Sequence, residues 1–302
     1  MGEQNNSNGP EGEENFENTG KYLQGKYAEI KSALGGGDFV NAFQHTAEIE
    51  KFKLDLVAKK ESREGKKVKI FGRGLEYTVY DIGAGRVRAR RNAIEEQDDV
   101  LCSWLIEDAE KRKRIAEAVN VLAEVSMNIV KTLLRRGKIQ GELLGNPIFE
   151  EGGADYTRDE ATSFSSDYIE GHTLEEGKGY IEKYIALVHT LWSSGVCDST
   201  FKFMENSGIT KDGDVIQRDI GEFAFTKGKV LSLIQNQAWL NQNFRFMPQG
   251  ELKEYAKKRF CEEFTPEKLE KFWPKPDGDG NDLNTQREEW EVLFQRYEEI
   301  WG

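Results

Sequence analysis

Two oxygen-bearing side chains, Asn206 and Asp219, lie thirteen residues apart, and the segment between them has the pattern of a β-hairpin. Lys211-Asp212-Gly213-Asp214 supplies the turn residues at its middle. A hairpin brings its two ends together, so an amide oxygen and a carboxylate would lie side by side. Both are hard ligands suited to Mg²⁺, which also binds phosphate oxygens and keeps several waters. Taken alone, the segment is equally consistent with a polar hairpin whose side chains are solvated.

A carboxylate and an amine precede this hairpin. Asp198 lies eight residues before Asn206, and Lys202 lies between the two. A carboxylate can accept a proton and an amine can neutralise an anionic group, so both residues are candidates for catalysis. A structural role for both residues is the alternative.

Two glycines, Gly72 and Gly74, lie at the turn of a predicted hairpin. Glycines two residues apart let backbone N–H groups approach phosphate oxygens, because no Cβ stands between them. Val79, on the strand that follows, would then have room to pack against an adenine ring. The alternative is that both glycines serve only the turn.

An extended connector, Asp167-Tyr168-Ile169-Glu170-Gly171, joins a predicted strand to the helices that follow. Its backbone N–H and C=O groups could bind the edge of an adenine ring, and Gly171 allows a change of direction. The alternative is a plain link between a strand and a helix.

The order of these motifs resembles the protein-kinase-like superfamily over roughly residues 66–260. More narrowly, the connector and Asp219-Ile220-Gly221-Glu222 are similar to atypical and small-molecule kinases of prokaryotes. The resemblance implies that ATP and Mg²⁺ are the cofactors and that Gly221 permits the turn after Asp219. It also implies roles for three sets of residues: phosphate cover (Gly72, Gly74), adenine hinge (Asp167, Tyr168, Ile169) and Mg²⁺ ligands (Asn206, Asp219).

Three features depart from the superfamily pattern. In the superfamily, the third strand carries a lysine that binds the α- and β-phosphates. Here the basic residues of the third predicted strand are all arginines, and Arg88 or Arg90 could take the place of that lysine. The position five residues before Asn206, where the catalytic aspartate is expected, is Phe201. The resemblance then implies that a local insertion lets Asp198 act as the base on the acceptor hydroxyl, with Lys202 near the γ-phosphate. The helix carboxylate that would pair with the strand cation is not fixed by the pattern, although Glu124 lies on a suitable turn.

The sequence thus supports two functions. The first is an ATP- and Mg²⁺-dependent phosphotransferase that acts on an unidentified hydroxyl acceptor, which is either a small molecule or a protein. The second is a catalytically weak pseudokinase that binds nucleotide or acts as a scaffold. Transfer of another part of the nucleotide, such as AMP, is a third option.

The predicted fold is α+β with two lobes. Residues 1–20 form a disordered acidic tail, because they contain few apolar groups, and residues 21–65 form an accessory helical segment. Residues 66–170 form a kinase-like N-lobe, with a small antiparallel sheet and one long helix. Residues 171–302 form a mostly helical C-lobe.

Composition restricts the partners and the compartment. The net charge of -12 over 302 residues argues against nonspecific nucleic-acid binding, which requires a basic surface. No apolar run approaches the length of about 20 residues that spans a bilayer. The cysteines, Cys102, Cys197 and Cys261, lack the spacing of a zinc site, so we expect reduced thiols in a cytoplasmic protein.

Overall fold

The structure is a computed structural model. It describes residues 28–29, 32, 70–73, 75–103, 106–150, 155–164, 169, 171–244, 247–274 and 281–301. The predicted acidic tail lies outside the described residues, and so does nearly all of the predicted accessory segment. In the parts that the structure describes, no helix is long and apolar enough to cross a membrane.

A five-stranded antiparallel sheet forms the first part of the described chain. Its order is β1-β2-β3-β5-β4, so the strand added last along the chain lies inside the sheet. Turn residues Gly83, Ala84 and Gly85 have positive φ and connect β2 to β3. The strands are β1 (Ile70–Arg73), β2 (Tyr77–Gly83), β3 (Arg86–Arg91), β4 (Ile148–Phe149) and β5 (Tyr156–Asp159). The first three strands confirm the predicted strands, whereas β5 was not predicted.

The one long helix predicted within residues 66–170 is divided into α3 (Ile94–Ser103) and α4 (Ala109–Arg135). The side chain of Asp108 accepts a hydrogen bond from the backbone N–H of Lys111 at 3.0 Å and so caps the second helix. The apolar positions of α4 recur at the helical period and are buried along one face. Both helices lie between β3 and β4 in the chain, and so between strands of the five-stranded sheet.

The remaining chain is mostly helical and contains two short sheets. One sheet has the order β6-β8-β9, and in the other β7 pairs with β10. A capping box between Thr173 and Glu176 begins α6. These elements are η1 (Gly141–Leu144), β6 (Ala161–Ser163), α6 (Leu174–Ser193), β7 (Cys197–Asp198), α7 (Phe203–Asn206), β8 (Ser207–Thr210), β9 (Val215–Gln217), β10 (Phe223–Ala224), α8 (Lys227–Gln235), α9 (Ala238–Asn243), α10 (Glu251–Glu263), α11 (Pro266–Phe272) and α12 (Asn281–Trp301). The predicted α+β class is confirmed.

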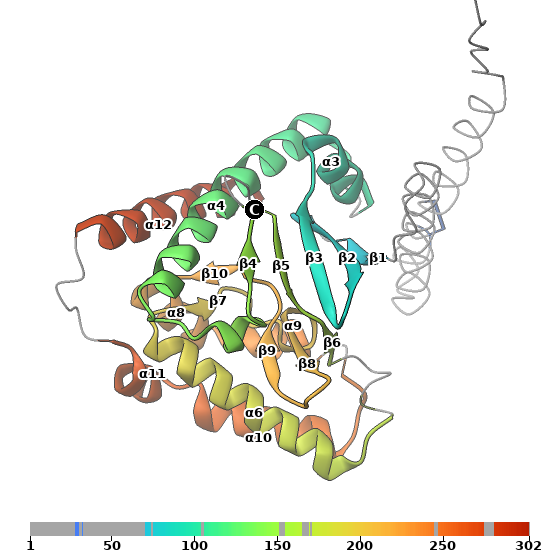
Figure 1. The fold of residues 1–302 in the computed structure, drawn as a ribbon, viewed down its shortest axis with the longest axis vertical. Helices are drawn as coiled ribbons and strands as arrows, with labels where there is room; N and C mark the ends of the chain where they lie inside the picture. Colours follow the sequence, from blue (N-terminus) through green and yellow to red (C-terminus); the bar gives the residue numbers. More distant parts are fainter. Residues whose placement is uncertain are drawn as a thin grey trace, which may run out of the picture.

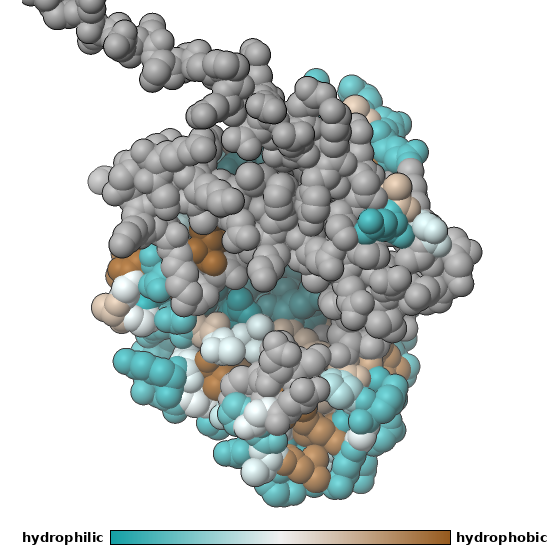
Figure 2. All heavy atoms as spheres, turned by 90° about the vertical axis from the view of Figure 1, so that its right-hand side faces the viewer, coloured by the Kyte–Doolittle hydropathy of each residue, from teal (hydrophilic) through white to brown (hydrophobic). Residues whose placement is uncertain are grey.

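The helices pack in pairs that are distant in sequence. Figure 1 shows α12 alongside α4 at one end of the molecule and α6 alongside α10 at the other. Large aromatic side chains fill the interior, among them Trp192, Trp239 and Trp290. On the face in Figure 2, the coloured surface is mostly hydrophilic, and apolar residues form small separate patches. Cys197 is buried and Cys261 is exposed, and neither forms a disulfide.

A buried hydrogen bond joins the last helix to α4. The indole Nε1–H of Trp290 donates to the Ser126 hydroxyl at 3.0 Å, and both side chains are buried. We expect Ser126→Ala to lower the free energy of unfolding by about 1–3 kcal/mol, because the indole N–H loses its acceptor. Chemical denaturation measures this change. Glu124→Ala, an exposed position on the same helix, is the control and should cost less than about 0.5 kcal/mol. If Ser126→Ala and Glu124→Ala lower the free energy of unfolding equally, the hydrogen bond between Trp290 and Ser126 does not stabilise the fold.

Candidate active site

Asp198 lies at the end of β7, opposite Phe223 of β10. Its side chain is only 3% exposed. Its Oδ1 accepts hydrogen bonds from the backbone N–H and hydroxyl of Thr200, both at 2.8 Å, and from the backbone N–H of Phe201 at 3.0 Å. Its Oδ2 accepts a bond from Gln217 Nε2 at 3.1 Å. The predicted base is therefore enclosed and holds the loop after β7 in place.

The predicted hairpin between Asn206 and Asp219 is present as β8 and β9. Asn206 ends the one-turn helix α7, and Ser207 begins β8 opposite Gln217 of β9. The backbone carbonyl of Asn206 accepts hydrogen bonds from the N–H of Arg218 at 2.6 Å and of Asp219 at 3.3 Å. The two predicted Mg²⁺ ligands thus lie together at the open end of the hairpin.

Glu222 joins this group, although the sequence analysis gave it no role. Its Oε2 accepts a hydrogen bond from Asn206 Nδ2 at 3.0 Å and lies 3.9 Å from Lys202 Nζ. The Asn206 amide also donates to the Thr200 hydroxyl at 3.1 Å. The side chains of Lys202 and Glu222 are each about a third exposed (30% and 31%). Lys202, Asn206 and Glu222 are therefore neighbours, and the first and last of them are open to ligand. Glu222 could have been identified from the sequence, because it is the last residue of Asp219-Ile220-Gly221-Glu222.

Glu76, from the hairpin between β1 and β2, approaches the same point from the sheet. Its Oε2 is buried and has no hydrogen-bond partner among the residues that the structure describes. A Cβ placed on Gly221 would lie 2.2 Å from this oxygen and 3.5 Å from Asp219 Oδ1. Gly221 does not have a positive φ. The chain bends at Gly221, and the glycine is needed there for this close approach, not for a left-handed backbone conformation.

These carboxylates repel one another in a poorly solvated region. Burial, with Glu222 as the largest neighbouring charge, raises the pKa of Asp219 to about 7. Burial and then the charges of Asp219 and Glu222 raise the pKa of Glu76 well above its usual value. Burial and Glu222 also raise the pKa of Asp198. This region therefore has too little positive charge for its carboxylates.

The donor set fits a hard divalent cation. Within the described ranges, no group of three or more His, Cys, Asp or Glu side chains has the spacing to hold a metal ion by itself. Mg²⁺ is commonly bound by one or two protein oxygens together with phosphate and water. The Asn206 amide oxygen and the Asp219 carboxylate match that pattern, and the unpartnered Oε2 of Glu76 is nearby. The residues thus suit a metal–phosphate complex better than a closed protein cage.

The structure does not bring Arg88 and Arg90 to this group, in contrast to the sequence expectation. Arg88 forms ion pairs with Glu150 and Asp155 at 2.9 and 3.2 Å. Arg90 forms an ion pair with Glu96 at 2.8 Å and donates to the Tyr80 hydroxyl. Side chains alternate between the faces of a strand, and both arginines lie on the face opposite to Val87 and Ala89.

Arg91 is the arginine on the inner face of β3. It is paired across the strands with Tyr77 and shares a face with Val87 and Ala89. Its Nε donates to Asn120 Oδ1 of α4 at 3.2 Å, and its Nη2 donates to the Asn120 backbone carbonyl. An asparagine thus occupies the position on α4 where the sequence analysis sought a carboxylate. Glu124, the residue considered there, is exposed.

The predicted nucleotide contacts are only partly described. Gly72 is paired with Val79 in β1 and β2, and Val79 is half-buried opposite Ala89 of β3. Ile169 is half-buried against the main core. Gly74, Asp167 and Tyr168 lie outside the described residues. The sheet therefore offers an apolar face at Val79 and Ala89.

Two further arginines lie near Asp219. Arg158 of β5 is 3% exposed, and Arg218 immediately precedes Asp219. Burial, followed by the charge of Arg158, lowers the pKa of Arg218 to about 10. The buried Arg158 and the half-buried Arg218 are thus near enough for their charges to influence each other.

A cavity of about 590 Å³ opens beside Lys202 and Glu222. Asp198 does not line it. Its polar wall includes Glu76, Thr200 and both of these charged residues. Its lining also includes apolar residues, partly from α12, together with the charged pair Lys229 and Glu298; the apolar residues include Leu75, Leu122, Trp290, Phe294 and Tyr297. The last helix therefore bounds the space in front of the charged group.

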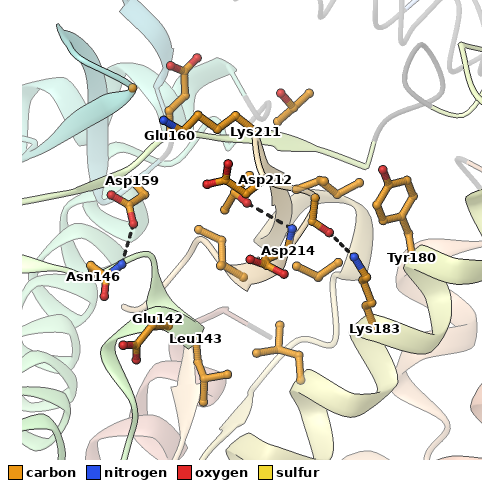
Figure 3. A pocket seen from close by; sticks show the side chains of 18 of the residues that line it. Glu142, Leu143, Asn146, Asp159, Glu160, Tyr180, Lys183, Lys211, Asp212 and Asp214 are labelled. Atoms are coloured by element: carbon orange, nitrogen blue, oxygen red, sulfur yellow. Dashed lines mark hydrogen bonds between the residues drawn. The ribbon is translucent and has the colours of Figure 1, made fainter.

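Another cavity, of about 960 Å³, lies at the β8–β9 turn and contains none of these charged residues. In Figure 3, Asn146 donates to Asp159, and Lys183 reaches the backbone of the β8–β9 turn. The Asn146–Asp159 bond is 2.7 Å long, and Asp159 also pairs with Arg86 at 2.8 Å. Because several of its polar groups bind one another, this cavity is a weaker candidate for an active site.

The charge imbalance predicts how stability depends on pH. In Mg²⁺-free buffer, deprotonation of Asp219 should lower the free energy of unfolding as the pH rises from about 4 through about 7, because the folded state favours the protonated acid. Asp219→Asn should therefore be more stable than the wild type at pH 8 by about 1–2 kcal/mol, and similar to it near pH 4. Denaturation at several pH values tests this. Asp212→Asn, at an exposed carboxylate, is the control. A constant difference between Asp219→Asn and wild type would contradict the electrostatic interpretation.

Comparison with known proteins adds no assignment. No protein-family model matches the chain, and no curated protein matches it.

Proposed function

We propose that this protein is an ATP- and Mg²⁺-dependent phosphotransferase that acts on a hydroxyl group. The observation that carries the proposal is the cluster of Lys202, Asn206, Asp219 and Glu222, of which Lys202 and Glu222 line a cavity. These residues supply metal-binding oxygens, a cation for a phosphoryl group and a carboxylate for a hydroxyl proton. Phosphoryl transfer requires mainly such positioning and charge neutralisation.

A two-lobed, kinase-like fold is part of the proposal. The antiparallel sheet with the order β1-β2-β3-β5-β4, and a long helix between β3 and β4, support it. So does the mostly helical part that follows, with Asn206 before a short hairpin and Asp219 after it. The apolar face at Val79 and Ala89 is suited to an adenine ring.

Each residue of the site has a definite task in this proposal. ATP and Mg²⁺, when bound, would supply the transferable phosphoryl group and neutralise much of its charge. Asn206 and Asp219 hold the cation, and Lys202 contacts the phosphoryl group. Arg91, fixed by Asn120, takes the place of the missing strand lysine. Gly221 keeps Glu76 close to Asp219.

Glu222 is better placed than Asp198 to accept the proton of the hydroxyl. Glu222 lines the cavity and is partly exposed, whereas Asp198 is 3% exposed and accepts four hydrogen bonds. A carboxylate that is occupied in this way orders its loop but does not reach an acceptor. We therefore assign the base to Glu222 and a positioning role to Asp198.

The cavity also indicates which class of molecule could supply the hydroxyl group that accepts the phosphate. Its volume of about 590 Å³ and its apolar wall from α12 suit a small molecule with an apolar portion next to its hydroxyl group. A protein side chain remains the other acceptor class. The acidic composition and the cysteine usage support a cytoplasmic protein that does not act on nucleic acid.

Metal-dependent nucleotide binding is the first test. ATP with Mg²⁺ should raise the unfolding temperature of the wild type, and ATP with a chelator should raise it less. Asp219→Ala should abolish the Mg²⁺-dependent part, because one of the two protein ligands is gone. A thermal-shift titration measures both effects, and Asp212→Ala is the control. An equal response of wild type and Asp219→Ala to Mg²⁺ would disprove this role.

The second candidate function is a pseudokinase that binds nucleotide without transferring phosphate. Two observations favour it specifically. The carboxylate of Asp198 is fully engaged by its own loop, and the inner-face cation is an arginine bonded to Asn120 instead of a lysine paired with a carboxylate. Both features depart from a site built for fast transfer.

Turnover of two matched variants separates the two functions. In an acceptor panel analysed by mass spectrometry, which distinguishes phosphate from AMP transfer, Glu222→Gln should lower turnover by about 100-fold and leave the Mg²⁺–ATP affinity within a few-fold. Asp198→Asn should lower both turnover and the unfolding temperature, since it disturbs the loop. If wild type and Glu222→Gln bind Mg²⁺–ATP but neither transfers phosphate nor hydrolyses ATP, the pseudokinase is the correct function.

A further inference from the structure

Arg158 carries a buried positive charge without a partner carboxylate. It is 3% exposed, and it forms no ion pair within 4 Å in the part of the chain that the structure describes. Its side chain forms a hydrogen bond with the Tyr156 hydroxyl, and its Nη1 donates to the backbone carbonyl of Asp159 at 3.1 Å, but its buried Nε–H has no acceptor among the described residues. Register places Arg158 opposite Val87, on the sheet face that also carries Ala89.

Arg218 likewise has a buried side-chain donor for which the described residues provide no acceptor. This donor is its Nε–H, and its Nη1 donates to the Glu205 backbone carbonyl over a long distance of 3.5 Å. The side chain crosses Gly208, where a Cβ would lie 2.4 Å from Arg218 Cδ and 3.0 Å from Ala161 Cβ. Gly208 thus makes room for Arg218 beside the start of β6, three residues after Arg158.

Such an arrangement is unfavourable without a ligand. Burying an unpaired charge is costly, and two like charges close together add repulsion. Guanidinium groups are also the donors best matched to the oxygens of phosphate. A neutral residue would avoid the cost if these positions served only packing.

We propose that Arg158 and Arg218 form an anion subsite that binds a phosphate group, at the base of the sheet face that carries Val87 and Ala89. This subsite lies next to Asp219 in the chain and binds phosphate without Mg²⁺. The inference rests on the proposed function only for the source of the phosphate, which would be the nucleotide. Free phosphate compounds share the same chemistry, and the experiment distinguishes them from nucleotide.

The test uses the full chain in the presence of a chelator, with pyrophosphate, ATP and adenosine as separate probes. Pyrophosphate and ATP should each raise the unfolding temperature of the wild type, and adenosine should raise it much less. Arg158→Met and Arg218→Met should each weaken pyrophosphate binding at least tenfold by calorimetry. Arg86→Met, at a paired arginine on the same sheet, is the matched control and should keep the wild-type affinity.

A second readout separates ligand binding from a structural role. Without ligand, Arg158→Met should have a higher unfolding temperature than the wild type, because it removes an unpaired buried charge, whereas Arg86→Met should have a lower or unchanged one. Arg158→Lys keeps the charge and should retain part of the pyrophosphate affinity. If Arg158→Met is less stable than Arg86→Met and binds pyrophosphate normally, the arginine is structural and the subsite is disproved.

The outcomes also separate this subsite from the proposed function. No response of the wild type to pyrophosphate would overturn the subsite, even if Mg²⁺–ATP binds and phosphate is transferred. Conversely, Asp219→Ala should keep the pyrophosphate response in chelator, because the arginines do not need the metal. A normal pyrophosphate response in a protein that shows no Mg²⁺-dependent ATP binding would support the subsite and contradict the phosphotransferase. A response by ATP but not by pyrophosphate would show that the base and sugar provide the binding, and would overturn the subsite.

Discussion

The excess of carboxylates around Asp219 is the constraint on which the rest of the site depends. Four acidic side chains, Glu76, Asp198, Asp219 and Glu222, influence one another there, and Lys202 is the nearest cation that the described residues offer to Glu222. Like charges in a region of low dielectric destabilise the folded state unless they are protonated or compensated. The fold brings these groups together despite that cost, which a bound cation would remove.

Three separate parts of the chain maintain this arrangement. The β8–β9 hairpin joins Asn206 to Asp219 through backbone hydrogen bonds, and the β7–β10 pair sets Asp198 beside the segment that carries Glu222. Gly221 then allows the β1–β2 hairpin to bring Glu76 within reach. On the far side of the cavity, α12 packs along α4, so the apolar wall depends on the end of the chain. A change in any one of these contacts alters the site.

Local patterns in the sequence predicted the parts of the site that lie within one hairpin. The turn at Lys211-Asp212-Gly213-Asp214 and the strands beside it were sufficient to place Asn206 near Asp219. Glu76 could not be predicted in this way, because its proximity arises from packing between elements more than 140 residues apart in the chain. Arg91 could have been found, since strand alternation sets it on the face of Val87 and Ala89, whereas Arg88 and Arg90 face the other way.

Three of the buried side-chain atoms without a hydrogen-bond partner in the described part of the chain belong to groups of opposite charge. Glu76 leaves an acceptor oxygen unused there, and Arg158 and Arg218 each leave a donor unused. If folding stability alone determined these positions, the groups would be paired with each other or replaced by apolar residues, because an unsatisfied buried polar atom costs about 1–3 kcal/mol. They are instead separated along the elements that surround Asp219. A ligand that carries both a cation and anionic oxygens would satisfy both kinds of group at once, and a metal-bound polyphosphate has that composition.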